Sequence, residues 1–414
     1  MNILVIHNFY KIPGGEDTVV KNDCELLKQM GHSVFLYTRH NNEIDGFSLF
    51  RKLILPFTFV YSFKSAGDVR RIIREKKIDV VMVHNTLSLI SPSVYYAATK
   101  RGVPVIQVVH NFRLLCPSAL LCRDGKVCED CLKNGLGCAL KHRCYRNSFV
   151  QTLICVVSDI IHRKSGIYGK LRYICLTEFN KDKLLNMKQI RPEMVYIRPN
   201  SAVQKDDWIP YDKRENVVLY AGRLDELKGI KELFEAWKIL EDLAAPGDSC
   251  SLPGLEICGT GPLKDWCEAF VKDNGLKRIR LCGPVKHDEI LKKAACAKAV
   301  VLPSKLYEGF PMVIAEAFSV GTPVIGSALG NTGDLVAGGR SLDKITSPCF
   351  TKRGALIDPG NMTGSLVETI RNWADFAYDD DAMRDTAGMY GREAGREVLE
   401  HILNEVVKQR LNVR

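Results

Sequence analysis

One stretch decides the fold of this chain: PSKLYEGFPMVIAEA, residues Pro303 to Ala317. It follows an apolar segment, Ala299 to Leu302, that is typical of a buried strand, and from Val313 onward it has the pattern of a short helix. A strand, a glycine-containing loop and a helix in this order form one step of a parallel α/β sheet. Two carboxylates lie eight positions apart within the stretch, Glu308 in the loop and Glu316 in the helix.

The same alternation of strand and helix extends through both halves of the chain. In the second half we predict strands at 217–220, 255–258, 279–281, 299–302 and 323–325, with helices at 230–243, 263–274 and 313–319. In the first half we predict strands at 3–6, 34–37, 79–83, 103–109 and 173–176, with helices at 17–30, 94–100 and 181–185. This order predicts an α/β protein of two tandem Rossmann-like, doubly wound domains, with ligands at the carboxyl ends of the strands.

The length of 414 residues also favours two domains, because one hydrophobic core does not ordinarily grow so large. We expect an N-terminal domain at 1–198 that contains a cysteine-rich loop at 111–148. A proline-containing linker at 199–215 leads to a C-terminal domain at 216–380. The remaining residues, 381–414, are expected to be helical, with a closing helix at 381–408 that packs back towards the N-terminal domain.

Composition and charge narrow the class of protein. The chain is 46% hydrophobic and 26% charged, it has no apolar run long enough for a membrane-spanning helix, and its start lacks the features of a secretory signal. We therefore expect a cytoplasmic protein. Residues 1–200 hold 30 Lys and Arg against 16 Asp and Glu, whereas the remainder holds 28 against 32. The basic first half indicates an anionic partner, although a well-solvated surface is the simpler explanation. No nucleic-acid-binding motif accompanies the basic residues, so nucleic acid is not an expected partner.

Several cations and glycines follow the predicted strands of the second half. Arg223 and Lys228 come after the strand at 217–220, where two cations suit a diphosphate; a structural salt bridge explains either residue equally well. Gly259 and Gly261 follow the next strand and allow close approach of the backbone to a ligand. The third glycine of a dinucleotide fingerprint is missing, which disfavours a nicotinamide enzyme.

The loop and helix of the opening stretch offer complementary contacts. In the segment 309–313 we expect the backbone N–H groups at the start of the helix to lack a partner within the helix and to form a site for an anion. Glu316 lies about one turn further on, where its carboxylate can accept hydrogen bonds from a pair of hydroxyls. Together with Glu308, this segment supplies most of the contacts that a nucleotide sugar needs.

With these residues described, a resemblance is evident. The segment Glu308 to Glu316 is similar to the E-x7-E signature of retaining glycosyltransferases of family 4, which have the GT-B fold of two Rossmann-like domains facing a cleft. The segments 221–229, 259–262 and 321–325 resemble the same family in order and spacing, as does the opening with Gly14, Gly15 and Glu16. The resemblance extends over almost the whole chain.

The resemblance implies roles for particular residues. Arg223 and Lys228 would bind the donor diphosphate, Glu308 the sugar hydroxyls and Glu316 the ribose, while Val285 would lie near the nucleobase. The donor-binding residues that it implies are Gly14, Gly15, Arg223, Lys228, Gly259, Gly261, Val285, Glu308, Gly309, Phe310, Pro311, Met312, Val313 and Glu316. The catalytic residues that it implies are His110, Arg223, Lys228 and Glu308.

His110 directly follows the predicted strand at 103–109. A lone histidine is more often structural, but the family carries a histidine here that faces the donor sugar. The expected role is orientation and electrostatic support of the reacting centre. Because Arg223 and Lys228 can neutralise the departing diphosphate, no cofactor is required for catalysis.

The loop 111–148 is dense in cysteine. Cys128 and Cys131 form a C-x-x-C pair, and Cys116 and Cys144 lie within reach of it along the chain. Four thiolates would suit a structural zinc ion in a loop with little apolar content. Free thiols and disulfides are the alternatives.

The run Leu53 to Phe63 is apolar and aromatic, with Arg51 and Lys52 before it and Lys64 after it. Core packing explains such a run, but apolar residues flanked by cations also describe a segment that lies on a membrane. We therefore expect a peripheral protein at the anionic inner face of the cell membrane, with a polyprenyl-diphosphate-linked or other glycan acceptor.

These observations predict a retaining glycosyltransferase of the hexosyltransferase type. It would move a sugar from a UDP- or GDP-sugar to a glycan or lipid-linked acceptor in surface polysaccharide or O-antigen biosynthesis. A nucleotide-sugar epimerase of the same fold is less consistent with the donor motifs. A nucleotide-sugar-binding scaffold without turnover is the alternative of a different class, and a donor screen discriminates between the two.

Overall fold

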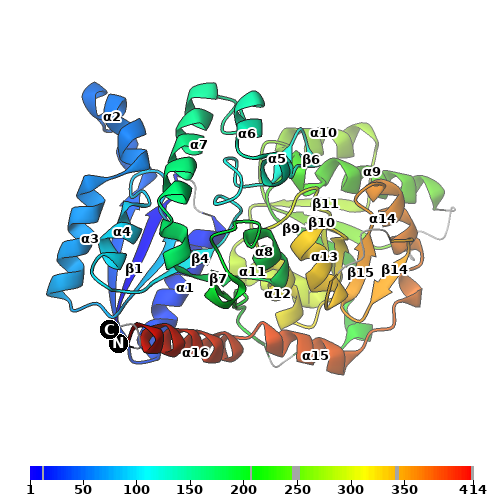
Figure 1. Cartoon of the computed structure of the whole chain (residues 1–414). Coiled ribbons are helices and arrows are strands. Elements are labelled where there is room, and N and C mark those ends of the chain that lie inside the picture. The colour runs from blue at the N-terminus through cyan, green and yellow to red at the C-terminus, as the bar shows by residue number, and fades with distance from the viewer. Residues whose placement is uncertain (12–13, 206–207, 245–251, 341–344, 412–414) are drawn as a thin grey trace. The chain divides into compact units, whose positions relative to one another are not determined.

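The computed structural model describes residues 1–11, 14–205, 208–244, 252–340 and 345–411. The chain forms two compact units (Figure 1). The first comprises residues 1–121, 128–199 and 396–414, and the second comprises residues 122–127 and 200–395. The segment expected as a linker, 199–215, is counted with the second unit apart from Pro199; its residues 206–207 lie outside the described part of the chain.

The first unit is built on a parallel sheet of six strands. Their order is β2 (Ser33–His40), β1 (Asn2–Phe9), β3 (Val80–Asn85), β4 (Val105–Val109), β7 (Arg172–Cys175) and β8 (Val195–Ile197). Apolar side chains of the central strands are fully buried, as expected when helices cover both faces of a parallel sheet. The strand order reverses between β1 and β3, so a ligand is expected beyond the carboxyl ends of these strands.

Eight helices in the described part of residues 1–199 surround or extend from this sheet, and most of α16 (Arg392–Leu411) also belongs to the first unit. The eight are α1 (Gly15–Gln29), α2 (Leu49–Val60), α3 (Phe63–Glu75), α4 (Ser93–Thr99), α5 (Asp130–Asn134), α6 (Gly137–Lys141), α7 (Phe149–Lys164) and α8 (Glu178–Leu184). The predicted strands of this half are all present. The helices α2, α3, α5, α6 and α7 were not predicted from the sequence.

The second unit contains a sheet of seven strands. Their order is β11 (Ile279–Gly283), β10 (Gly254–Cys258), β9 (Glu215–Ala221), β12 (Ala297–Leu302), β13 (Val324–Ser327), β15 (Gly354–Ile357) and β14 (Cys349–Thr351). Only β14, at one edge, is antiparallel to its neighbour. The order reverses between β9 and β12, which places the switch point of this sheet beside the loops that follow these two strands.

Two hydrophobic clusters hold the sheet of the second unit to its helices. One includes Phe234 and Trp237 of α9 (Ile230–Leu243), and the other includes Phe318 of α12 (Met312–Ser319). The remaining helices are α10 (Lys264–Asp273), α11 (His287–Cys296), α13 (Gly330–Ala337), α14 (Met362–Arg371) and α15 (Asp380–Met389). The prediction of two doubly wound α/β units is confirmed.

The single closing helix predicted at 381–408 is wrong, because two helices occupy this segment. α15 ends at Met389, and α16 begins at Arg392 and runs to Leu411. Between them the Tyr390 carbonyl accepts a hydrogen bond from the Ala202 N–H (2.9 Å), and Gly391 bridges to Ala202. The backbone at Tyr390 and Gly391 therefore pairs with Ala202 and does not continue the hydrogen bonds of α15 into α16.

Candidate functional site

The Glu308 side chain lies between β12 and α12, at the switch point of the second sheet. Its Oε1 accepts a hydrogen bond from Lys228 Nζ at 2.6 Å and another from the Ser304 hydroxyl at 2.5 Å. The carboxylate is largely buried, with 13% of the side chain exposed, and the Lys228 side chain is 26% exposed. The structure therefore brings together two predicted donor-binding residues that are 80 positions apart in the chain.

A buried asparagine fixes the backbone on either side of the carboxylate. Asn331, at the start of α13, donates from Nδ2 to the carbonyl of Glu308 (2.5 Å) and to that of Gly309 (2.7 Å). Its side chain is fully buried. Asn331 and Ser304 were missed by the sequence analysis, because neither residue type stands out in a loop or at a helix start.

Gly229 holds the Lys228 segment against the Glu308 loop. Its φ is +70°, and a Cβ at this position would lie 1.9 Å from the carbonyl oxygen of Pro303. Close to this contact, the Lys305 N–H donates to the Leu227 carbonyl at 2.9 Å. Only glycine allows both the left-handed backbone and this close approach.

Gly259 and Gly261 serve packing between loops within the second unit. A Cβ on Gly259 would lie 1.8 Å from the Gly222 oxygen, and one on Gly261 would lie 2.3 Å from the Leu224 oxygen. The Leu224 N–H also donates to the Thr260 carbonyl at 3.1 Å. The sequence analysis attributed these glycines to contact with a ligand. The structure adds another reason, since they let the loop that carries Arg223 lie directly on the loop 259–261.

Arg223 and Glu316 occupy different surroundings from Glu308. The Arg223 side chain is 60% exposed, and its Nε lies 3.6 Å from Asp225 Oδ2. Glu316 lies in α12 and contacts His287 of α11, with Nε2 to Oε1 at 2.9 Å. The resemblance did not include His287, and no spacing in the sequence indicated it.

The start of α12 supports the expected anion site. The helix begins at Met312 after Pro311, and no acidic residue lies in its first turn. Phe310, Met312, Val313 and Val285 are half-buried, as is Gly309. The N–H groups of the first turn of an α-helix have no partner within the helix, and the helix dipole adds partial positive charge there.

In the first unit, His110 lies at the carboxyl end of β4 and contacts a second histidine. Its Nε2 is 2.9 Å from Nδ1 of His84, which lies in β3, and the two rings are stacked with centroids 5.2 Å apart. Both residues line a small pocket together with Asn111 and Arg113. Burial lowers the pKa of both histidines well below the ordinary value, so both are neutral near pH 7.

A buried ion pair lies behind His84. Asp23 of α1 accepts a hydrogen bond from Arg198 (Nη2 to Oδ1, 2.7 Å), and its other oxygen, Oδ2, lies 3.9 Å from Nε2 of His84. Both side chains of the ion pair are almost fully buried. Asp23 follows Val20 by three positions and precedes Leu27 by four, so it lies on the apolar face of α1. A carboxylate on an apolar helix face is the signal that could have revealed it.

The loop that carries Gly14 and Gly15 leads into another buried acidic group. Asp17 accepts from the Gly14 N–H (2.9 Å) and contacts His7 Nε2 (2.8 Å). Glu16 accepts from the Tyr10 hydroxyl at 3.1 Å and from Asn111 at 3.3 Å. Burial raises the pKa of Glu16 to about 8, which makes this carboxyl predominantly protonated near pH 7.

The cysteine loop gathers some of the predicted thiols. The thiols of Cys116 and Cys131 share a hydrogen bond, which lowers the pKa of Cys116 to about 5. Cys131 belongs to a small hydrophobic cluster against which Cys138 and Cys144 also pack. No group of three His, Cys, Asp or Glu side chains is arranged to hold a metal ion in the described ranges. The zinc site at Cys116, Cys128, Cys131 and Cys144 stays a prediction.

Comparisons with known proteins agree with this architecture. A family model described as Glycosyltransferase Family 4 matches residues 13–127, and one described as Glycosyl transferases group 1 matches residues 205–393. The chain is 27% identical over 241 residues to an uncharacterized glycosyltransferase of Methanocaldococcus jannaschii, MJ1607 (50% of this chain and 58% of that protein). It is 22% identical over 405 residues to one component of the human phosphatidylinositol N-acetylglucosaminyltransferase (91% and 74%). The match to MJ1607 thus spans less than two thirds of that relative.

Solved structures resemble the chain over nearly its full length. The apo form of the lipopolysaccharide outer core galactosyltransferase WaaB superposes with a TM-score of 0.63 at 17% identity, over 98% of this chain and 99% of that chain. Alr3699/HepE of Anabaena in complex with UDP gives a TM-score of 0.60 at 16% identity, over 98% and 100%. At these identities the likeness shows the fold.

The fold and the two family matches identify the chain as a GT-B glycosyltransferase, as the motifs predicted. The retaining mechanism and the role of the E-x7-E segment stay predictions. Its N-terminal part carries the family 4 domain, and its C-terminal part carries the group 1 domain.

Proposed function

We propose that the chain is a retaining glycosyltransferase that moves a hexose from a nucleotide-diphosphate donor to a glycan or lipid-linked acceptor. The observation that carries the proposal is the ion pair between Lys228 and Glu308 at the switch point of the second sheet, directly before the start of α12. A cation for a phosphate, a carboxylate for sugar hydroxyls and the start of a helix, where an anion is favoured, lie close together in this unit.

The Lys228–Glu308 ion pair would exchange partners when a donor binds. Lys228 neutralises the largely buried carboxylate of Glu308. A donor diphosphate would offer Lys228 a second anionic partner, and the sugar hydroxyls would donate to Glu308. Arg223, whose side chain is exposed on the same loop as Lys228, would add a second cation. These cations would stabilise the leaving nucleotide as the glycosidic bond breaks.

His110 is the residue of the first unit that we propose to act at the donor sugar. Its neutral imidazole can make one further hydrogen bond, through Nδ1, beyond the contact of Nε2 with His84. The Gly14 N–H donates to Asp17, so the Gly15 N–H at the start of α1 would be the contribution of this segment to the diphosphate. No step in this scheme uses a metal ion.

Two comparisons support the proposed substrates. The Anabaena neighbour was solved with UDP, which favours a nucleotide-sugar donor. The names of the galactosyltransferase neighbour and of the human relative refer to lipopolysaccharide and to phosphatidylinositol, which favours a glycan or lipid-linked acceptor. We propose a role in surface polysaccharide or O-antigen assembly at the inner face of the cell membrane. No helix in the described ranges has the length and apolar character to cross a membrane.

Donor binding tests the site directly. A thermal-shift panel of UDP- and GDP-sugars should raise the apparent melting temperature for at least one donor. Lys228→Ala and Glu308→Gln should each abolish most of this shift. Lys231→Ala is the matched control, because Lys231 is three residues further on and is also paired with a carboxylate (Glu226, 3.4 Å). A shift that is unchanged in Lys228→Ala and Glu308→Gln would place the donor elsewhere and overturn the assignment.

A further inference from the structure

The helix α2 exposes its apolar side chains to solvent. Leu49 is 82% exposed, Phe57 is 76% exposed, and Phe50, Leu53 and Ile54 are also exposed. No residue of this helix is buried. Since these positions recur at spacings of three and four, they form one continuous apolar stripe along the helix. None of the large side chains of the run 53–63 is buried, and four of them (Leu53, Ile54, Phe57 and Phe63) are exposed, so packing in the core does not explain the run.

A second helix, α7, carries a stripe of the same kind. Its exposed apolar residues are Phe149, Val150, Leu153, Val157, Ile160 and Ile161. The opposite face of α7, with Cys155 and Val156, is buried. This helix was not predicted from the sequence. Its exposed apolar stripe is an observation independent of the sequence pattern in 51–64 that suggested a membrane segment.

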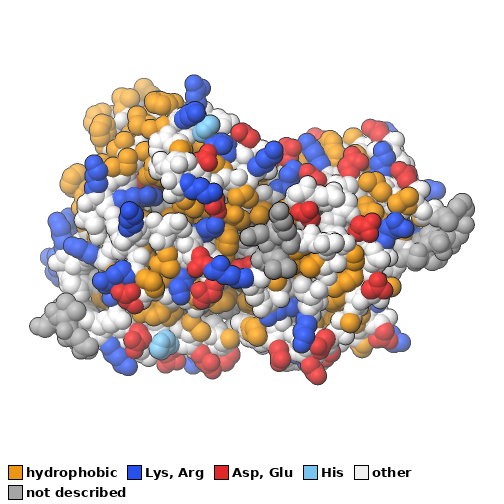
Figure 2. Space-filling view, turned by 45° about the vertical axis from the view of Figure 1, so that its right-hand side comes forward, with side chains coloured by type: hydrophobic (Ala, Val, Ile, Leu, Met, Phe, Trp, Pro, Cys, Tyr) orange, Lys and Arg blue, Asp and Glu red, His pale blue; other side chains and the backbone are white. Residues whose placement is uncertain are grey.

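The two helices lie against each other in the first unit. α2 packs on α7, and His162 of α7 contacts the carbonyl oxygen of Val60 at the end of α2 (2.9 Å). Twelve of the eighteen large exposed hydrophobic residues of the described chain lie on α2, on α7 or at Phe63. We call these twelve residues the α2–α7 surface. Figure 2 shows hydrophobic side chains gathered at the upper left, with Lys and Arg side chains nearby.

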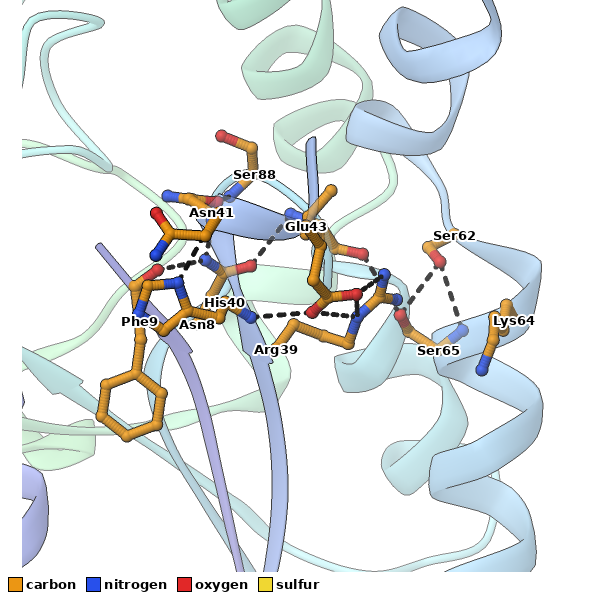
Figure 3. Close-up of polar contacts among 12 residues, drawn as sticks. Asn8, Phe9, Arg39, His40, Asn41, Glu43, Ser62, Lys64, Ser65 and Ser88 are labelled. Carbon is orange, nitrogen blue, oxygen red and sulfur yellow. Dashed lines mark hydrogen bonds and ion pairs between the residues drawn. The ribbon is translucent and has the colours of Figure 1, made fainter. Parts of the chain in front are cut away.

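Hydrogen bonds fix the chain segments before and after α2, whereas the helix itself exposes apolar side chains. Before the helix, Asn41 accepts from Asn8 (2.9 Å) and from the Ser88 N–H (3.3 Å); after it, the Ser62 hydroxyl accepts from the Ser65 N–H (Figure 3). The Ser62 N–H donates to the Ser91 hydroxyl at 2.8 Å. These contacts tie the segments on either side of the helix to the first unit, so its exposed stripe is a feature of a folded segment.

Cations predominate over carboxylates in the segments that form this surface. Residues 46–67, which include α2, contain three Lys or Arg and no Asp or Glu, and residues 131–158, which lead into α7, contain four and none. The cations of the first segment are Arg51, Lys52 and Lys64, all exposed. Lys64 pairs with Asp68 of α3 (2.9 Å), which leaves Arg51 and Lys52 as the main cations beside α2. The one carboxylate within α7 is Asp159, which is half-buried. A protein partner would be expected to meet a surface of mixed charge, whereas an anionic lipid leaflet combines apolar chains with a uniformly negative boundary.

We infer that the α2–α7 surface inserts its apolar stripes into the boundary layer of an anionic lipid bilayer while the flanking Lys and Arg side chains contact lipid phosphates. The surface exposes far more large apolar side chains together than monomeric proteins ordinarily show. Its helices are too short to span the bilayer, so they lie in its interface. The inference extends the proposed function, because a lipid-linked acceptor is met at such a boundary, but lipid binding does not require turnover.

Vesicle co-sedimentation of the full chain tests the inference. The probes are vesicles of phosphatidylcholine alone and of phosphatidylcholine with phosphatidylglycerol in equal parts, at low and high salt. We expect binding to the anionic vesicles, little binding to the neutral ones, and weakening by salt because the cations at the rim are screened.

Variants separate the apolar and charged contributions. Leu53→Glu combined with Phe57→Glu should lower vesicle binding about tenfold or more, since two apolar contacts with lipid are replaced by charges. Arg51→Glu combined with Lys52→Glu should remove most of the preference for anionic vesicles. Leu243→Glu is the matched control, because Leu243 is an exposed leucine (60%) of the second unit. Since all of these positions are exposed, the variants should keep the wild-type melting temperature.

Two outcomes would overturn the inference. One is equal sedimentation of the wild type with and without anionic vesicles at low salt. The other is a dimer in solution that Leu53→Glu with Phe57→Glu disrupts without vesicle binding by the wild type, which would assign the surface to a second copy of the chain. The thermal shift produced by a nucleotide sugar should persist in the variants designed to weaken vesicle binding. If it does, a failure of vesicle binding leaves the proposed donor site intact.

Discussion

Glu16 carries a buried carboxyl group next to Gly14 and Gly15. Its ionisation makes the stability of the folded protein depend on pH. Burial raises its pKa in the folded protein to about 8, whereas an unfolded chain would have the ordinary value of about 4.5. A raised pKa stabilises the folded state fully below pH 4.5. This stabilisation is lost as the pH rises through about 8, because the folded protein must then release the proton or bury a charge.

Glu16→Gln should therefore remove part of the pH dependence of stability. The free energy of unfolding of the variant, relative to the wild type, should rise between pH about 5 and pH about 9, since Gln cannot ionise. The histidines with lowered pKa act in the opposite direction, below pH about 6.5, and cancel in this difference. Urea unfolding of both proteins at the two pH values measures it. A constant difference would contradict the assignment of the raised pKa to Glu16.

His84 is expected to be a positioning residue for His110. The Asp23 carboxylate near Nε2 favours a proton on that nitrogen, which leaves Nδ1 of His84 to accept a hydrogen bond from His110. This would fix the tautomer of His110 and leave its Nδ1 as an acceptor.

His84→Leu should lower kcat about tenfold or more while the KM for the donor changes little, because the lost contact orients a group at the reacting centre. His84→Asn, whose amide can replace Nδ1, should recover part of the loss. Steady-state kinetics with the preferred donor measure both parameters, and a melting temperature close to that of the wild type controls for folding. A change confined to KM, with no recovery in His84→Asn, would indicate a packing role only.

At the scale of single residues, the sequence indicated the charged residues in loops of the site but not the polar residues within helices. Glu308 and Lys228 stand in glycine-containing loops after apolar strands, where a charged residue signals a site. Asp23 and Asn331 lie inside helices, and their partners Arg198 and Gly309 are distant in the chain. No spacing along one element encodes such pairs.

At the scale of elements, the loop between β9 and α9 is held by Gly229. Gly229→Ala should destabilise the protein by about 1–3 kcal/mol or more and weaken donor binding, because a Cβ would push Pro303 and with it the Glu308 loop. Gly275→Ala is the matched control: Gly275 also has positive φ (+63°), but its Cβ would have no heavy atom within 4 Å. Urea unfolding and the donor thermal shift measure the two effects. Equal behaviour of both variants would show that the close approach to Pro303 is unimportant.

The cysteine-rich loop is the element whose chemistry remains a prediction. Elemental analysis of protein purified without chelator should find about one zinc per chain, and Cys131→Ser should release it. Cys349→Ser is the control, because Cys349 lies in β14 of the second unit. Zinc absent from the purified wild type would contradict the prediction and leave the Cys116–Cys131 contact as a pair of free thiols.

Element types were predictable where the hydrophobic pattern was strong. The buried strands and the long amphipathic helices α1 and α9 were placed within a few residues. α2 and α7 were not recognised as helices, because their exposed faces are as apolar as a buried run. In α2 this follows from side chains such as Leu53 and Phe57, which face solvent instead of the core. The periodic alternation of apolar and polar residues, which ordinarily distinguishes the buried face of a helix from its exposed face, is absent from these segments.

At the scale of the whole molecule, the chain connects its two units more than once. It leaves the first unit after Pro199 and returns to it at Arg396, within α16. The returning part buries Leu399, Ile402 and Leu403, and Gln409 accepts hydrogen bonds from Arg172 (2.9 and 2.7 Å). The repeated α/β pattern predicted two units, but the apolar pattern alone did not indicate the break between α15 and α16.

We propose that this GT-B chain turns over a nucleotide sugar at the Lys228–Glu308 site. The most direct measurement is the release of UDP or GDP from a panel of nucleotide sugars, followed by chromatography, for the wild type, Lys228→Ala and Lys231→Ala. We predict release from at least one donor by the wild type and Lys231→Ala, and a loss of about 100-fold or more in Lys228→Ala. Donors that bind to the wild type without any release or transfer, with or without membrane acceptors, would contradict the claim and identify a nucleotide-sugar-binding scaffold.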